Sequence, residues 1–404
     1  MMKRLRQALP SLTRNAWVII ISWILFRFGT YLSMPYVPNY IRMLCGSEAA
    51  IGIAYALNSF FIALFTIPGG YIGDLYGRRR IVVYMTWGLI LAQVLLISAI
   101  SPAMVLLYFI LDGILHVYIP ALHAIFADSL PEDERARGFM LSEVLPNLIA
   151  IPAPLIGGLV IAWLGGVKGY RAALVVTLSL SLMAASLRHF MLEETLPTAL
   201  KGAFGQIAKD AFKKSYTDIF KALRIIGREV KVAIVLVMVQ GMIVSTCMNY
   251  MVRYAMLVGF DERVWGEMNT ISSLVVVIMG LILSPIMDLF DRVALMSISA
   301  LSMGVGLFMF ARADYISMLA GLTILNLFLM TYRSAMLSYM TDKVEQPLRG
   351  RISAVRLFLM QISRALGNLV GAFIYPMMPM YTFIIASMAL LALAPLYAVL
   401  KVVD

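Results

Sequence analysis

The stretch Gly70-Tyr71-Ile72-Gly73-Asp74-Leu75-Tyr76-Gly77-Arg78-Arg79-Arg80 separates two long apolar runs and decides how the rest of the chain is interpreted. Its glycines let two helices approach closely at a tight turn, because a residue without a Cβ takes up little room. Asp74 favours a helix N-terminus, where the helix dipole is positive. The arginines need carboxylate partners. The stretch therefore predicts a tight, charged turn between two apolar helices.

The same spacing returns in degraded form 214 residues later, and the offset holds without gaps from the first apolar run to the fifth. The matched pairs are Tyr36 with Tyr250, Tyr40 with Tyr254, Asp74 with Asp288, Arg78 with Arg292, Asp128 with Asp342, Arg135 with Arg349, Arg137 with Arg351, and Gly157 with Gly371. Because repeats of this length decide the architecture of many membrane proteins, we expect two similar halves in parallel orientation.

Composition places the chain in a membrane. Of its 404 residues, 61% are hydrophobic and 14% are charged, whereas a soluble domain carries about 25% charged residues. A membrane span needs roughly 20 apolar residues. Twelve apolar runs meet this need, at 16–41, 50–72, 81–100, 103–127, 139–164, 170–191, 231–258, 264–287, 293–311, 316–341, 352–375 and 380–400. These runs exclude a water-soluble globule and predict an all-α polytopic membrane protein with twelve transmembrane helices in two six-helix bundles.

The runs divide the chain into residues 1–192 and 230–404, joined by a connector over residues 193–229. The connector alternates basic and apolar residues, which is typical of an amphipathic helix lying on anionic lipid headgroups; a regulatory module is the alternative. The first run continues past Tyr31 without a cleavage site, so we interpret it as a retained span rather than a signal peptide.

Lysine and arginine outnumber aspartate and glutamate by 33 to 22, which gives a net charge of +11. Most of these basic residues fall at one set of helix ends and in the connector. Cytoplasmic loops carry such an excess. We therefore expect a multi-pass protein of the plasma membrane with both termini in the cytoplasm, and no nucleic-acid partner.

The turn around Asp74 resembles the loop signature of the major facilitator superfamily. The resemblance implies that Asp74, Arg78 and Asp128 form a charge network that latches the inner face and is remade during alternating access. The alternative is that these charges only set topology. The inner-gate residues implied in this way are Gly70, Asp74, Gly77, Arg78, Arg79, Asp128, Arg135, Arg137, Glu143, Asp288, Arg292, Asp342, Arg349, Arg351 and Arg356.

The fifth run contains Pro154, Gly157 and Gly158, which resemble a signature of the antiporter branch of that superfamily, although Ala153 stands where the family has a glycine. Close packing of helices would also explain these residues. The resemblance favours export over import.

The fourth run departs from the family, because the residues of the usual proton relay are absent. It carries instead Asp112, His116 and His123, whose spacing puts them on one helix face. Asp and His together can exchange protons near neutral pH, so these residues are the candidates for proton coupling. A structural ion pair between Asp112 and Arg27 is the alternative.

Polar stripes on four spans predict a central substrate cavity, because the resemblance implies that spans 1, 4, 7 and 10 line one. The predicted cavity residues are Arg27, Tyr31, Asp112, His116, Asn249, Arg253, Asn326, Arg333 and Arg364. Arginine suits bidentate binding of oxyanions, so the cavity predicts a negatively charged substrate. The many methionines and aromatic residues would equally suit a lipophilic drug.

The sequence contains no Walker loop, nucleotide-binding fingerprint or metal-spaced Cys/His cluster, so we expect no enzyme activity, cofactor or metal. The expected function is secondary active transport of a small solute by alternating access, coupled to protons, with export favoured over import. Alternatives are an uptake or exchange carrier for organic phosphates or organic acids and, more distantly, an intramembrane enzyme or lipid scramblase. The expected partners are the solute, protons and membrane lipids, with the protein working as a monomer.

Overall fold

The structure is a computed structural model that describes residues 12–196, 204–287, 289–344 and 349–402. In these residues the chain forms helices and no strand, and twelve helical segments are long and apolar enough to cross a membrane. The predicted all-α fold with twelve spans is thus confirmed. The helices of the first bundle are α2 (Arg14–Ser33), α3 (Val37–Cys45), α4 (Ala49–Tyr76), α5 (Arg78–Ile97), α6 (Pro102–Leu115), α7 (Ile119–Asp128), α8 (Arg135–Ile149), α9 (Ala153–Leu164) and α10 (Gly166–Met191).

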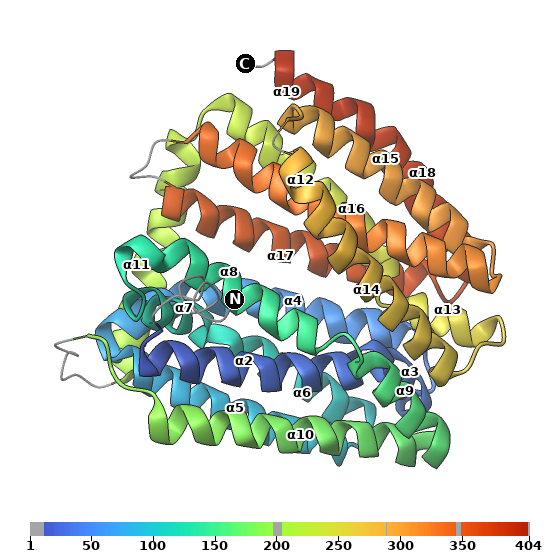
Figure 1. Cartoon of the computed structure of the whole chain (residues 1–404), viewed down its shortest axis with the longest axis horizontal. Helices are drawn as coiled ribbons and strands as arrows, with labels where there is room; N and C mark the ends of the chain where they lie inside the picture. Colours follow the sequence, from blue (N-terminus) through green and yellow to red (C-terminus); the bar gives the residue numbers. More distant parts are fainter. Residues whose placement is uncertain (1–11, 197–203, 288, 345–348, 403–404) are drawn as a thin grey trace, which may run out of the picture.

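The second bundle follows the connector helix α11 (Phe204–Ile225). Its helices are α12 (Arg228–Met248), α13 (Met251–Leu257), α14 (Glu262–Met287), α15 (Arg292–Ala311), α16 (Tyr315–Asp342), α17 (Arg349–Ile374), α18 (Pro379–Leu393) and α19 (Val399–Val402). Figure 1 shows the bundles side by side, close together where α3, α9 and α13 lie and further apart toward α11. We call these the closed end and the motif end, since the Gly70–Arg80 turn lies at the latter.

Prolines lie at the breaks that divide the first and fourth spans into shorter helices. In the first span a 3-10 turn, Met34–Tyr36, separates α2 from α3, with Pro35 and Pro38 at the first helical positions. In the fourth span the turn His116–Tyr118 separates α6 from α7, where Pro120 lacks a backbone N–H to continue the helix. These breaks bend the inner spans at mid-depth.

The 214-residue repeat is visible in the packing. The Tyr40 hydroxyl donates to the carbonyl of Leu96 at 3.1 Å, and its repeat equivalent Tyr254 donates to that of Ala311 at 2.8 Å. A Cβ on Gly157 would lie 1.9 Å from the Leu32 carbonyl oxygen. The equivalent Cβ on Gly371 would lie 2.3 Å from the carbonyl oxygen of Thr246, the repeat equivalent of Leu32. Equivalent helices therefore cross at equivalent residues in the two bundles.

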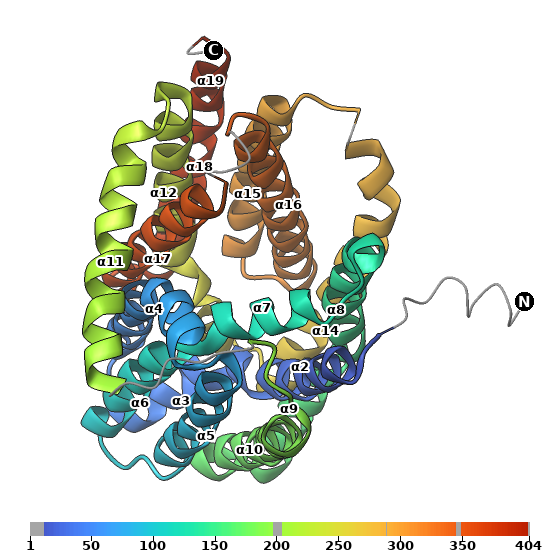
Figure 2. The same ribbon diagram turned by 90° about the vertical axis from the view of Figure 1, so that its left-hand side faces the viewer.

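Helix α11 runs beside both bundles at the motif end, as Figure 2 shows. The Tyr216 hydroxyl donates to the Leu64 carbonyl of α4 at 2.7 Å, and its ring meets Phe358 of α17 with centroids 5.9 Å apart. Phe212 meets Phe65 edge to face, and Tyr71 donates to Asp218 at 2.7 Å. The expectation that the apolar face of this helix lies on lipid is therefore wrong. It packs on protein and spans the boundary between the bundles.

Candidate functional site

A cavity of about 340 Å³ lies between the two bundles. Its walls come from α4 on one side and from α12, α16 and α17 on the other. Its polar lining includes the amides Asn58, Gln240, Asn249, Gln361 and Asn368. Pockets for small molecules commonly enclose about 300 to 1,000 Å³, so this central cavity is large enough to hold a small solute.

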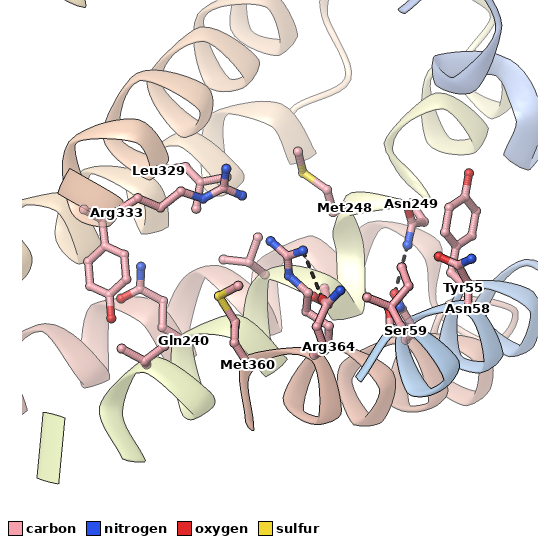
Figure 3. A pocket seen from close by; sticks show the side chains of 18 residues that line it. Tyr55, Asn58, Ser59, Gln240, Met248, Asn249, Leu329, Arg333, Met360 and Arg364 are labelled. Carbon is pink, nitrogen blue, oxygen red and sulfur yellow. Dashed lines mark hydrogen bonds between the residues drawn. The ribbon is translucent and has the colours of Figure 1, made fainter. Parts of the chain in front are cut away.

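Two arginines of the second bundle, Arg333 of α16 and Arg364 of α17, line the central cavity (Figure 3). Among the residues that the structure describes, no Asp or Glu lines it. Arg364 donates a hydrogen bond to the Gln361 side-chain oxygen at 3.3 Å. Within the described part of the chain, Arg333 has neither a hydrogen bond nor an ion pair. A cation inside a membrane bundle is costly unless something compensates it. The cavity is therefore electropositive.

Some of the residues predicted for the cavity line it and others do not. Arg333, Arg364 and Asn249 line it, and Asn326 lines a neighbouring smaller pocket. Arg27 lies 3.8 Å from Glu143 of α8 and has its guanidinium over the Tyr31 ring. These residues belong to the first bundle and are not in the cavity wall.

The Asp112 carboxylate lies behind the cavity wall, where Asn58 connects it to the lining. The Asn58 side-chain nitrogen donates to Asp112 Oδ2 at 2.8 Å and to the Phe109 carbonyl at 3.1 Å. His116 Nδ1 is 3.4 Å from the same carboxylate. The alternative ion pair of Asp112 with Arg27 is wrong, because Arg27 instead pairs with Glu143.

His123 does not join this pair. The 3-10 turn and Pro120 interrupt the helix between His116 and His123, so the regular spacing that would put both on one face is lost. The His123 ring packs on Trp23 of α2, with centroids 5.4 Å apart.

At the motif end, Arg78 joins two carboxylates: its Nε donates to Asp74 at 2.9 Å and its Nη1 donates to Asp128 at 2.5 Å. Gly77 supplies the turn, with φ of 112°, a conformation that residues with a side chain rarely adopt. Arg79 caps the end of α10 by donating to the carbonyls of Leu192 and His189. The turn thus ties α4, α5, α7 and α10 together.

The structure describes only some of the other predicted gate residues. Arg135 lies 3.8 Å from Glu132, Arg137 is exposed, and Gly70 faces Pro120. Arg292 and Arg356 line two small pockets of the second bundle, while Asp342 lies at the end of α16. Asp288 and the side chains of Arg349 and Arg351 lie outside the described residues.

In the repeated turn of the second bundle, Asp291 is the N-cap of α15. Asp291 accepts from the Ala294 N–H at 2.8 Å and lies 3.2 Å from the Lys401 ammonium. These two partners hold the pKa of Asp291 below its ordinary value.

The closed end holds the bundles together by polar bonds that the sequence did not suggest. Arg253 was expected in the cavity, but its guanidinium binds Glu48 of α4's N-terminus at 2.8 Å and also contacts Asn39. Glu262 of α14 accepts from Asn39 at 3.1 Å and from Tyr170. Because Asn39 and Arg253 are repeat equivalents, their contact places the pseudo-symmetry axis between them. The 214-residue offset between Asn39 and Arg253 is the sequence signal that could have located their contact.

Pro154, Gly157 and Gly158 lie in α9 where it crosses α2 and α14. Tyr36 donates to the Pro154 carbonyl, and a Cβ on Gly158 would lie 2.3 Å from the Glu262 carbonyl oxygen. These residues allow close packing between the bundles at the closed end.

Two helical bundles that enclose a polar cavity in a chain with twelve spans define a membrane transporter. The family model described as Major Facilitator Superfamily matches residues 19–266. The chain belongs to the major facilitator superfamily, which is a family of transporters and not an enzyme class.

Curated relatives are distant. The uncharacterized MFS-type transporter YqjV of Bacillus subtilis (strain 168) is 27% identical over 144 residues, 35% of this chain and 35% of that protein. The Na(+), Li(+), K(+)/H(+) antiporter of Planococcus maritimus is 26% identical over 190 residues, 45% of this chain and 43% of that protein. The chain thus spans less than half the length of these relatives.

Among solved structures, a crystal structure of the peptide transporter POT in complex with sulfate is similar. It has a TM-score of 0.78 at 14% identity, and the match covers 99% of this chain and 97% of that one. At this identity the likeness shows the fold alone.

Proposed function

We propose that the protein is a secondary active transporter that moves a small anionic solute by alternating access. The observation that carries the proposal is the central cavity, which presents the guanidiniums of Arg333 and Arg364 and no carboxylate. Guanidinium groups bind carboxylates and phosphates in bidentate fashion, and an anion would offset the cost of holding these charges inside the membrane. We therefore expect the solute to bind at the guanidiniums of Arg333 and Arg364.

The conformation supports the alternating-access part of the proposal. The Glu48–Arg253 ion pair and close glycine contacts join the bundles at the closed end, while at the motif end the bundles lie further apart (Figure 1). With both termini cytoplasmic, as the distribution of basic residues predicts, the closed end would face the outside of a plasma-membrane carrier. Loss of the bonds at the closed end would let the bundles separate there and give access to the cavity from that end.

Asp112 and His116 are the proposed site of proton coupling. Asn58 touches both the cavity and the Asp112 carboxylate, so a change in protonation of Asp112 alters a residue of the cavity wall. The other titratable groups near Asp112 are the phenols of Tyr55 and Tyr108. The name of the antiporter relative and the Pro154 to Gly158 segment support export over import.

The second candidate is exchange of cations for protons, which the name of the antiporter relative suggests. A cation needs an accessible carboxylate, and Asp112 is the acid nearest the cavity. The two arginines in the same cavity disfavour this candidate, because they repel a cation.

The test is a thermal-shift panel on the purified full chain, with phosphate, sulfate and benzoate against sodium, lipophilic amines and sugars. A ligand that binds only the folded protein raises its melting temperature. The proposal expects the anions to stabilise the protein and the other ligands to leave it unchanged. Stabilisation by amines or sodium without any by anions would overturn the anionic substrate.

A further inference from the structure

A second cavity of about 200 Å³ adjoins the central cavity on the side of the closed end. We call it the closed-end pocket. Tyr55, Met248 and Asn249 line both cavities and so form the wall between them. In Figure 3 Tyr55 and Asn249 stand at one end of the central cavity, Arg333 stands at the other, and Met248 lies between them. The two cavities therefore follow one another along the boundary between the bundles.

The lining of the closed-end pocket is mostly apolar, and none of the described residues in it is charged. Its surfaces include Met34, Pro35, Met251, Trp265 and Leu322. Methionine side chains adapt to guests of varied shape, and an indole offers a large flat surface. The lining therefore suits a hydrocarbon chain or an aromatic ring.

The side-chain N–H groups of the three asparagines and of Trp265 in the closed-end pocket donate to protein acceptors. Asn249 donates to Asn368 at 2.9 Å, Asn269 to the Trp265 carbonyl at 2.8 Å, and Asn326 to Ser272 at 3.2 Å. The Trp265 N–H donates to the Pro35 carbonyl at 3.2 Å. A guest in this pocket thus gains mainly by removing apolar surface from water.

We propose that the two cavities form one divided site for an amphiphilic organic anion. Its acidic head binds Arg333 and Arg364, and its alkyl or aryl part passes the wall of Tyr55 and Met248 into the closed-end pocket. This inference rests on the proposed transport of anions and narrows the substrate to that class. A small hydrophilic anion such as phosphate would use only the central cavity.

The experiment measures binding of straight-chain carboxylates, from acetate to decanoate, to the purified full chain. Burying each added methylene should tighten binding about fourfold until the pocket is filled, after which affinity should level off. Alcohols and amines of the same lengths are the controls for partition into detergent. The variants Met34→Ala and Leu322→Ala enlarge the pocket, so the length at which affinity levels off should increase. Met34 is only partly buried, which keeps the test usable if Leu322→Ala fails to fold.

The fluorescence of Trp265 tests whether the alkyl part of the anion lies in the closed-end pocket. In a variant that keeps Trp265 and replaces the four other tryptophans by phenylalanine, an ω-bromo carboxylate should quench the indole. In a matched variant that keeps only Trp163, which is 84% exposed on α9, the same compound should not quench.

The outcomes separate the two proposals. Anion binding that depends on Arg333 but is equal for acetate and decanoate would overturn the divided site and leave anion transport standing. Chain-length dependence that is shared by the alcohols and unchanged in Met34→Ala would overturn it as well. If no carboxylate of any length binds, both proposals fall.

Discussion

The two bundles face the space between them with different charge chemistry, although they descend from one repeat. In the first bundle each inward charge has a partner: Arg27 pairs with Glu143, and Asp112 binds Asn58 and His116. In the second bundle Arg333 makes no hydrogen bond or ion pair within the described residues, and Arg364 donates only to a neutral amide. An arginine that is already paired with a carboxylate binds an anionic solute weakly, whereas an unpaired arginine binds it strongly. This difference supports the proposal that the second bundle binds the solute and that the first exchanges protons.

The largest effect is expected from the arginines. Arg333→Gln or Arg364→Gln should weaken anion binding about 10- to 100-fold each, because each removes a charge-assisted bond. Arg27→Gln should change affinity far less, since that charge is already paired. Calorimetric titration measures the affinity of each variant for the anion that stabilises the protein most in the thermal-shift panel. Equal losses from Arg27→Gln and Arg333→Gln would break the distinction between the bundles.

Removing the acid of the first bundle should separate coupling from binding. Asp112→Asn should abolish uptake driven by a pH gradient in liposomes while sparing exchange of labelled for unlabelled solute, because the neutral amide keeps the bond to Asn58 but carries no proton. His116→Gln should act in the same direction with a smaller effect. If exchange falls as much as driven uptake, Asp112 has a structural role only.

Breaking the ion pair between Glu48 and Arg253, which joins the two bundles, should have a smaller effect. Glu48→Gln should leave Arg253 without its anion and shift the population toward separation of the closed end, roughly tenfold for a half-buried pair. Arg42→Gln is the matched control, because Arg42 binds Glu48 at 3.0 Å within the first bundle and does not cross the boundary.

Spin labels on the exposed residues Met43 and Leu257, one on each bundle, report the distance across the closed end. The native cysteines are first replaced, as Cys45→Ser and Cys247→Ala. We expect a longer distance to gain population in Glu48→Gln and not in Arg42→Gln. Identical distance distributions in the two variants would remove Glu48 from the gate.

The smallest effect compares equivalent packing positions. Gly157→Ala and Gly371→Ala should each destabilise the protein by about 1 to 3 kcal/mol, since the added methyl group meets a carbonyl oxygen of the neighbouring helix. Gly157→Ala should cost more, because its contact is the tighter of the two. Gly70→Ala is the control, because a Cβ there would lie 3.7 Å from Pro120. If Gly70→Ala had the lowest melting temperature of the three variants, this packing would be contradicted.

Much of the fold could be predicted because it depends on local or periodic properties. Apolar runs of sufficient length give spans whatever their neighbours are, and the turn from Gly70 to Arg80 could be assigned from glycine spacing and charge. The pairing of Arg78 with Asp74 is also local, because the two residues are four apart in the chain across the Gly77 turn. The connector was the exception, because amphipathicity shows that a helix has an apolar face and not whether lipid or protein covers it.

The site could be predicted only in part. Arg333 and Arg364 were found because an arginine inside a span is conspicuous, and they line the cavity. Arg253 was equally conspicuous but lies at the closed end. Its partner Glu48 is 205 residues away in the chain, and no periodic pattern links the two.

By itself, the sequence determined the membrane environment, the number of spans, the repeat and the charged turn, because hydropathy and spacing act along the chain. Only the tertiary structure decided which charges have partners. Proline breaks in the first and fourth spans rotated residues away from regular helical faces, and bonds such as Asn39 with Arg253 form between residues of different bundles. Compensation of a charge depends on distances in space, so the electropositive cavity became evident only once the bundles were packed together.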